Sequence, residues 1–157
     1  PENNLLFAFF DAEEMGLQGS KHFMQSVVMD TSRIKMNVNL DMVSRGDKNE
    51  LFAVGTYFTP YLKPLLNEAS KDKSIKLLFG RDIPKENPYW VNASDHAPFH
   101  QAEIPFIYFG VDDHPDYHKI TDTADKINPD FYLEAIRLIK DAITIFDANL
   151  QEIVYGK

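Results

Sequence analysis

The sequence contains no cysteine, and no apolar run in its 157 residues approaches the length of a membrane span. Without cysteine, disulfides and thiolate zinc sites are both excluded, so any metal ion would be held by Asp, Glu, His or backbone oxygen. A helix that crosses a bilayer needs roughly 20 consecutive apolar residues, and no such segment is present. The composition therefore predicts no membrane association through a spanning helix.

Positive charge is also scarce, since 16 Lys and Arg face 24 Asp and Glu, for a formal net charge of −8. This balance argues against a nucleic-acid partner or an anionic membrane surface. There is no repeat, low-complexity tract or linker, and 44% of the residues are hydrophobic. We therefore interpret residues 1–157 as a single globular domain.

The chain opens almost at once on a continuous apolar run at residues 5–10, which reads LLFAFF. Such a run is typical of a strand that is covered on both faces of a sheet. No initiator Met or leader precedes it. We interpret residues 1–157 as an N-terminally truncated domain from which the first strands are missing.

Strands and helices are predicted to alternate, which indicates an α/β fold with a largely parallel sheet. The predicted strands are residues 5–10, 34–43, 51–54, 75–79 and 104–109, and the predicted helices are residues 16–29 and 57–70, a short one capped by Ser94, and one that starts at residue 129. For the last helix, Asn128 is the expected cap and Pro129 lies in the first turn. Its expected apolar stripe comprises Tyr132, Ile136, Ile139, Ile143, Phe146 and Leu150.

Carboxylates follow two of the predicted strands, at the sheet edge where α/β proteins bind their ligands. Asp11, Glu13 and Glu14 come after the first strand, and Asp41 closes the second. Carboxylates gathered at a buried strand end repel one another, and a divalent cation is one way to offset the repulsion. An acidic first helical turn is the alternative for Glu13 and Glu14, and a turn-forming role is the alternative for Asp41.

Two further segments carry candidate site residues. Residues 112–123 read DDHPDYHKITDT, which places His118 four residues before Asp122, so that this Asp could orient the imidazole. Zinc accepts imidazole and carboxylate together, although a solvated acidic loop would have the same composition. Asp95, in SDHAPF, is either a site carboxylate or part of a capped helix start.

Four blocks in order, FAFFDAEEMGLQGSKHF, NVNLDMV, SDHAPFHQAEIPFIYFG and DYHKITDTADKI, resemble the co-catalytic zinc aminopeptidases of metallopeptidase family 28. The resemblance implies a three-layer α/β/α sandwich with a mostly parallel central sheet, the phosphorylase/hydrolase-like zinc exopeptidase fold. It also implies a peptide substrate cleaved at its N-terminal residue by a zinc-activated water. The implied cofactor is a pair of zinc ions, although cobalt or manganese would suit the same ligands.

The resemblance assigns roles to individual residues. Glu13 would be the general base, and Glu14 and His118 would bind one zinc ion while Asp41 binds the other. Tyr117 would stabilise the oxyanion, and Asp95 would be a further active-site carboxylate.

The family also uses a His and a bridging Asp from an upstream segment that this sequence lacks. We therefore expect the chain alone to be inactive and to bind one zinc ion weakly or none. The missing strands would leave a sheet edge open to self-association.

Three other functions remain open at this point. A glutaminyl cyclase has similar carboxylate geometry, but the Tyr117–His118 pair followed by Asp122–Thr123 favours a peptidase. A carboxypeptidase would share the metal core, and a non-catalytic peptidase-like module would keep only the fold. The family resemblance further implies a secreted or periplasmic location.

Overall fold

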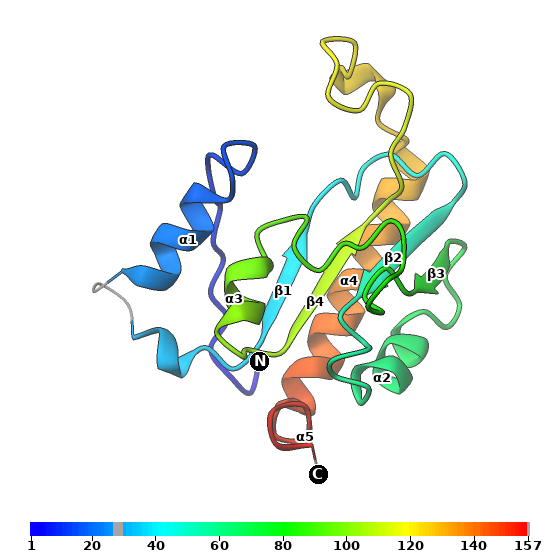
Figure 1. Cartoon of the computed structure of the whole chain (residues 1–157). Helices are drawn as coiled ribbons and strands as arrows, with labels where there is room; N and C mark the ends of the chain where they lie inside the picture. The colour runs from blue at the N-terminus through cyan, green and yellow to red at the C-terminus, as the bar shows by residue number, and fades with distance from the viewer. Residues whose placement is uncertain (27–29, 157) are drawn as a thin grey trace.

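A computed structural model describes residues 1–26 and 30–156 and shows a four-stranded sheet with helices on both faces (Figure 1). The strands are β1 (Asn37–Leu40), β2 (Glu50–Val54), β3 (Lys76–Phe79) and β4 (Phe106–Gly110). The helices are α1 (Gln18–Gln25), α2 (Leu62–Ala69), α3 (Ala97–Gln101), α4 (Pro129–Ala148) and α5 (Leu150–Tyr155), with 3-10 turns η1 (Thr31–Arg33) and η2 (Ala124–Lys126). Within the described ranges, no helix is long and apolar enough to cross a membrane.

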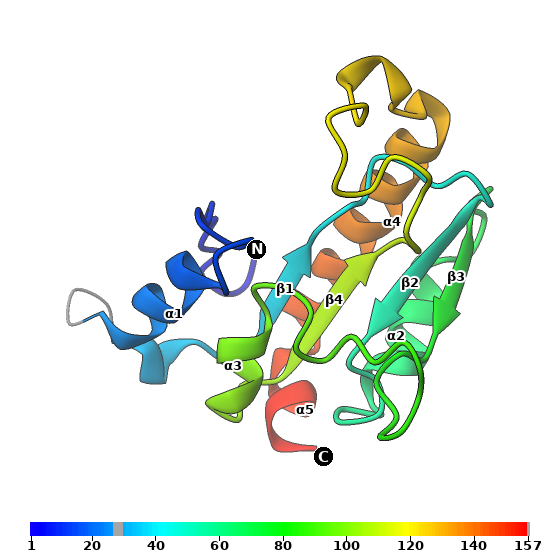
Figure 2. The same ribbon diagram turned by 45° about the horizontal axis from the view of Figure 1, so that its top comes forward.

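The strand order is β1-β4-β2-β3, and two of the three pairings are parallel (Figure 2). β1 runs parallel to β4 with Val38 opposite Ile107, whereas β2 runs antiparallel to β4 with Ala53 opposite Phe109. β1 and β4 therefore end at one edge of the sheet, and β2 and β3 end at the other. The predicted mostly parallel sheet is confirmed, with one antiparallel pair at its centre.

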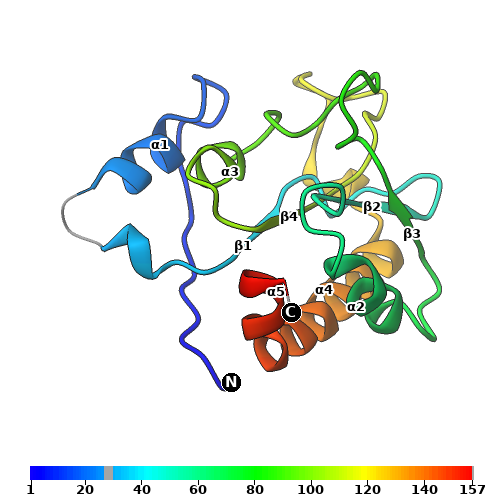
Figure 3. The same ribbon diagram turned by 60° about the horizontal axis from the view of Figure 1, so that its bottom comes forward.

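Helices cover both faces of the sheet, which gives the predicted three layers (Figure 3). Side chains alternate between the faces along each strand, as the pleat requires. One face packs with α2 and α4 and includes Leu51, Ala53, Ile107 and Phe109. The other face includes Phe52, Val54, Phe106 and Tyr108, and it packs against the segment that carries Trp90 and Val91.

Helix α4 begins as predicted, because the side chain of Asn128 accepts a hydrogen bond from the backbone N–H of Phe131 over 3.1 Å. Its predicted apolar stripe is confirmed at Ile139 and Phe146, which are buried, and is wrong at Tyr132 and Ile136, which are exposed. The buried positions are Phe131, Ala135, Leu138, Ile139, Ala142 and Phe146. Small Ala side chains let α4 approach its neighbours closely, and the bulkier residues selected from the sequence lie partly outside that contact.

The predicted strand at residues 5–10 is not formed. These residues have no regular secondary structure, and the side chains of Phe7 and Phe9 are 77% and 95% exposed. A strand requires a neighbouring ladder of backbone partners, and β4 is the only described strand that pairs with β1. An apolar run alone therefore did not identify a buried strand here.

The remaining elements agree with the predictions in type and differ at their ends. The predicted strand at residues 34–43 shortens to β1, and the helix predicted at residues 57–70 shortens to α2. The helix predicted at residues 16–29 is observed as α1, while the end placed at Met29 lies outside the described residues.

Candidate active site

An open cavity of about 2000 Å³ runs along the whole of β1 and on past the carboxyl ends of β1 and β4, and residues 3–10 also line it. Its wall includes segments that directly follow these strands, among them Asp41 and Asp113. All six residues singled out from the sequence line this cavity, namely Glu13, Glu14, Asp41, Asp95, Tyr117 and His118. The tertiary structure thus brings together residues from four separate segments.

Glu13 and Glu14 lie in a tight turn that precedes α1. The backbone N–H groups of Gly16 and Leu17 both donate to the carbonyl oxygen of Glu13, over 2.9 and 2.8 Å. Helix α1 starts only at Gln18, and its first turn contains no acidic residue. The alternative explanation of these carboxylates as an acidic first helical turn is therefore excluded.

Asp41 follows β1, and its carboxylate is held by the side chain of Ser94 from a separate segment. The Ser94 hydroxyl donates to Oδ2 of Asp41 over 2.8 Å and accepts from the side-chain amide of Asn39 over 2.9 Å. Ser94 is fully buried. This relay orients the Asp41 carboxylate, and the sequence analysis missed it, although the period-two pattern does place Asn39 and Asp41 on one face.

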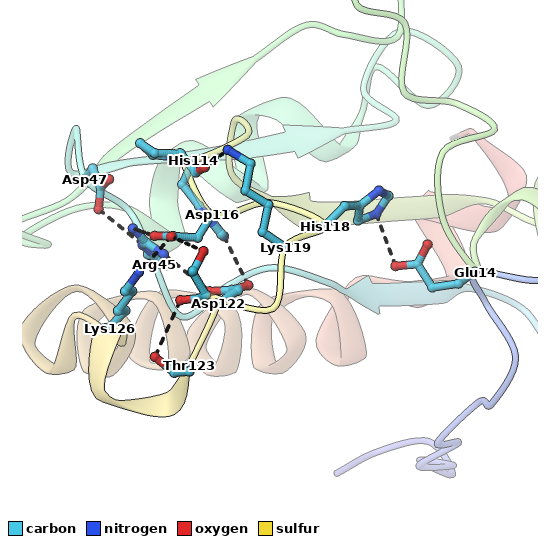
Figure 4. Close-up of polar contacts among 12 residues, drawn as sticks. Glu14, Arg45, Asp47, His114, Asp116, His118, Lys119, Asp122, Thr123 and Lys126 are labelled. Atoms are coloured by element: carbon cyan, nitrogen blue, oxygen red, sulfur yellow. Dashed lines mark hydrogen bonds and ion pairs between the residues drawn. The ribbon is translucent and has the colours of Figure 1, made fainter.

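The segment of residues 111–123, here called the site loop, leads from β4 toward η2 and presents Tyr117 and His118 to the cavity. Nε2 of His118 lies 3.1 Å from Oε1 of Glu14 (Figure 4). The ring of His118 stacks on Tyr117 with centroids 3.9 Å apart. Two predicted ligands of one metal ion are therefore adjacent, and the predicted oxyanion donor packs against one of them.

Asp122 does not orient His118, so that interpretation of their spacing is wrong. One carboxylate oxygen of Asp122 lies 3.3 Å from Nη1 of Arg45, and the other lies 3.6 Å from Nε2 of His114 (Figure 4). The spacing suits a helix, whereas the site loop is irregular and His118 has a left-handed φ of 56°. The two side chains consequently find different partners.

A profile of peptidase family M28 matches residues 1–143, which is most of the chain. The chain belongs to peptidase family M28. It is similar to BSAP, a zinc aminopeptidase from Bacillus subtilis, at 27% identity and a TM-score of 0.67 over 88% of this chain. An aminopeptidase from Aneurinibacillus sp. strain AM-1 is 30% identical, with a TM-score of 0.66 over the same share.

Two further comparisons show how far the similarity extends. Leupeptin-inactivating enzyme 1 of Streptomyces exfoliatus is 29% identical over 106 residues, which make up 67% of this chain and 22% of that protein. LapA of Legionella pneumophila has a TM-score of 0.70 at 21% identity, which supports the fold. The chain spans 34% of BSAP and 32% of the Aneurinibacillus enzyme, so it corresponds to about a third of each.

The surroundings of the site raise the pKa of two of its side chains, Glu13 and Tyr117. Burial, together with the nearby carboxylates of Asp41 and Glu14, raises the pKa of Glu13. Burial and the negative charge of Asp113 raise the pKa of the Tyr117 phenol. Glu13 is therefore a stronger base than an exposed glutamate, and Tyr117 remains a hydrogen-bond donor at neutral pH.

Asp95 lines the cavity, whereas its neighbour His96 does not. Burial raises the pKa of Asp95, and one of its carboxylate oxygens has no hydrogen-bond partner. Neither Ser94 nor Asp95 caps α3, because its N-cap is His96 and no side chain caps its first turn. The fully buried His96 ring stacks between Phe106 and Tyr108, which makes it a structural histidine.

The donor chemistry of the site suits zinc, which binds imidazole and carboxylate oxygen together. His118 and Glu14 already place a nitrogen and an oxygen 3.1 Å apart. Across residues 1–26 and 30–156, however, no group of three or more His, Asp or Glu side chains is close enough to hold a metal ion. The described residues therefore do not form a complete metal site.

Proposed function

We propose that this chain is part of a zinc-dependent aminopeptidase and supplies its general base and some of its metal ligands. The observation that carries the proposal is the convergence of Glu13, Glu14, Asp41 and His118 on one cavity. Membership of family M28 and the likeness to zinc aminopeptidases support it. The substrate would be a peptide with a free N-terminus.

Glu14 and His118 would hold one zinc ion, and Asp41 would hold a second. Bound zinc supplies Lewis-acid polarisation of a carbonyl group and lowers the pKa of water. The relay from Asn39 through Ser94 would keep the Asp41 carboxylate turned toward the cavity. Such supporting hydrogen bonds typically raise metal affinity.

Glu13 would act as the general base. Its carboxylate would accept a proton from the attacking water and later deliver that proton to the leaving amine. Proton transfer is most efficient when the pKa of the base lies near the working pH, and burial, the largest cause of the raised pKa of Glu13, moves it in that direction. Asp95 contributes to this shift, since its negative charge also raises the pKa of Glu13.

Tyr117 would donate a hydrogen bond to the substrate carbonyl oxygen as negative charge develops there. Its raised pKa keeps the phenol protonated, and the stacked His118 ring restrains its orientation. In other hydrolases, removing one hydrogen-bond donor aimed at the developing charge costs about 3 kcal/mol of transition-state stabilisation.

Zinc titration of the 157-residue chain by isothermal calorimetry tests the ligand assignment. We expect at most one weakly bound zinc ion, with affinity lost in Glu14→Gln and in His118→Ala. His22→Ala is the matched control, because His22 is exposed on α1 and does not line the cavity. Equal zinc affinity in all four proteins would contradict the assignment.

Activity provides a second test of the same proposal. Because no group of three or more possible ligands is close enough to hold a metal ion among the described residues, we expect no rapid hydrolysis of an aminoacyl anilide by this chain, with or without zinc. Robust zinc-dependent hydrolysis would show that the ligands present suffice.

The end of the peptide that binds can be determined by NMR titration of the zinc-loaded chain. A peptide with a free N-terminus should shift the signals of Glu13 and Tyr117 more than its N-acetylated counterpart. Equal shifts would favour recognition of the other end, as in a carboxypeptidase. Cyclisation of an N-terminal Gln peptide would instead favour a glutaminyl cyclase.

Self-association and location are further proposals. Among the described strands only β4 pairs with β1, so the described residues place no strand on the other side of β1. The exposed side chains of Leu6, Phe7 and Phe9 line the same cavity as Leu40 of β1 and would be available to a second copy of the chain. We expect concentration-dependent dimerisation, which sedimentation velocity would detect. A secreted or periplasmic location remains a prediction of the family resemblance.

A further inference from the structure

Two irregular segments meet beyond the carboxyl ends of β1 and β4. One is the connection of residues 41–49, which carries Asp41, and the other is the site loop, which carries His118. These two residues are the proposed ligands of different zinc ions, so the distance between the segments would set the distance between the ions. The backbone N–H of Asp41 still donates to the carbonyl oxygen of Phe109 in β4 over 3.1 Å, so the sheet fixes the start of the first segment. Beyond that point the two segments are linked by side-chain contacts.

Asp116 is the centre of those contacts (Figure 4). Its Oδ1 accepts from Thr121 Oγ1 over 2.6 Å and from Lys126 Nζ over 2.7 Å, which closes the site loop onto η2. Its Oδ2 lies 2.8 Å from Nη2 of Arg45, which belongs to the other segment. Arg45 also reaches Asp122, so its guanidinium bridges two positions of the site loop.

The bridge is sheltered from solvent, with side chains of Arg45 and Asp116 only 14% and 15% exposed. Ion pairs of fully exposed side chains contribute little, whereas sheltered networks with several hydrogen bonds are stronger. A backbone hydrogen bond from the N–H of Asn128 to the carbonyl oxygen of Ser44 over 3.1 Å ties residues 41–49 to the start of α4, which follows the site loop and η2. The connection is therefore built from several contacts.

His118 needs such support, because its φ of 56° lies in the left-handed region that residues with a Cβ rarely adopt. A conformation of this kind persists only where the surrounding structure enforces it. Asp116 and Thr121 flank His118 in sequence and are joined by a hydrogen bond, so they clamp the strained residue from both sides.

We propose that Arg45 and Asp116 are positioning residues that hold the His118 loop at a set distance from Asp41 and so determine how well the site binds zinc. The proposal rests on the proposed function. It predicts that breaking the bridge loosens the site loop even without metal, and weakens zinc binding as a consequence.

The competing explanation is an ordinary ion pair that stabilises the fold without directing the site. Lys73 and Asp141 offer a matched control, since they form a 2.7 Å ion pair with side chains 15% and 36% exposed. Neither residue lines the cavity. Loss of this pair should affect stability without affecting the site loop.

The experiment compares Arg45→Gln, Asp116→Asn and Lys73→Gln in the 157-residue chain. Amide hydrogen exchange of the site loop is measured without metal, and zinc affinity is measured by competition with a chelator. We expect the first two variants to speed exchange in the site loop and to weaken zinc binding at least about tenfold. Lys73→Gln should leave loop exchange and zinc affinity unchanged. Arg45→Lys should show a smaller defect than Arg45→Gln in both measurements, because it recovers one contact.

The proposal is overturned if Arg45→Gln and Asp116→Asn lower stability but match Lys73→Gln in loop exchange and zinc affinity. Failure of the proposed function gives a different result. In that case the unaltered chain would not bind zinc through His118, while the exchange measurement would still show whether Arg45 and Asp116 position the loop.

Discussion

The hydroxyl of Ser94 donates a hydrogen bond to Oδ2 of Asp41 over 2.8 Å, and it is itself buried. Ser94 precedes α3 and Asp41 follows β1, so this contact ties a predicted metal ligand to a separate segment of the chain. The side chain of Asn39 completes the arrangement by donating to the same hydroxyl. The carboxylate of Asp41 is thus oriented before any metal binds.

Ser94→Ala should therefore affect both stability and zinc binding. The change leaves the Asn39 amide without its acceptor and removes a donor to Asp41, at a cost of about 1–3 kcal/mol. Zinc affinity should fall roughly tenfold or more. Urea denaturation and zinc titration would measure the two effects. Ser70→Ala is the control, because the Ser70 hydroxyl donates to the nearby carbonyl of Asn67, away from the cavity. If neither variant changed the zinc affinity, the role assigned to Ser94 would be contradicted.

Stability should decline on mild acidification because of His96. Burial lowers the pKa of this ring to about 4 from an ordinary value of 6.5. The unfolded chain takes up a proton below pH 6.5 while the folded protein does not, so folding free energy is lost between pH 6.5 and about 4. The full loss is of order 3 kcal/mol, and urea denaturation at several pH values would reveal it.

A substitution isolates the contribution of His96 from that of the carboxylates. His96→Gln cannot titrate, so the difference in unfolding free energy between this variant and the parent should vary with pH in that window. His22→Gln, at an exposed position on α1, should follow the parent protein throughout. A difference that stays constant with pH would show that His96 does not titrate as expected.

Gly46 should not tolerate a side chain. A Cβ placed there would clash with the ring of Phe131 on α4. Gly46→Ala should therefore force the ring to move and destabilise the fold by about 1–3 kcal/mol. Thermal and urea unfolding would measure the loss.

The double variant Gly46→Ala/Phe131→Leu tests the steric cause of that loss. The smaller Leu side chain makes room for the new methyl group, so the two changes together should cost less than the sum of their separate effects. Strict additivity would mean that Gly46 is required for a reason other than contact with Phe131.

Asn128→Ala should destabilise the protein by about 1 kcal/mol, because it removes the side-chain acceptor for the N–H of Phe131. Asn128→Ser supplies another good cap and should retain most of the stability. Urea denaturation of the three proteins measures the difference. A serine variant as unstable as the alanine variant would mean that the cap hydrogen bond does not explain the effect.

Much of the fold could be predicted from local patterns. The Asn128–Pro129 signal identified the start of α4, and the short apolar runs identified β2 and β4. These predictions succeeded because capping and strand formation there depend on residues within a few positions of one another. The six candidate residues were likewise found from sequence blocks, and the structure places them around one cavity.

Other features required the tertiary structure. Residues 5–10 have the composition of a buried strand but no regular structure, because a strand depends on a partner elsewhere in the chain. The buried face of α4 was predicted only in part, because close contact selects Ala135 and Ala142 as well as large side chains. Hydropathy along a helix does not report which neighbour packs against it.

The sequence by itself determined the family, the types of nearly all elements and the chemical identity of the site residues. The tertiary structure decided that Ser94 orients Asp41, that Asp122 pairs with Arg45, and that Glu14 meets His118. The reason is physical. Helix caps and strand patterns arise from neighbours along the chain, whereas these contacts join segments that only the folded backbone brings within hydrogen-bonding distance.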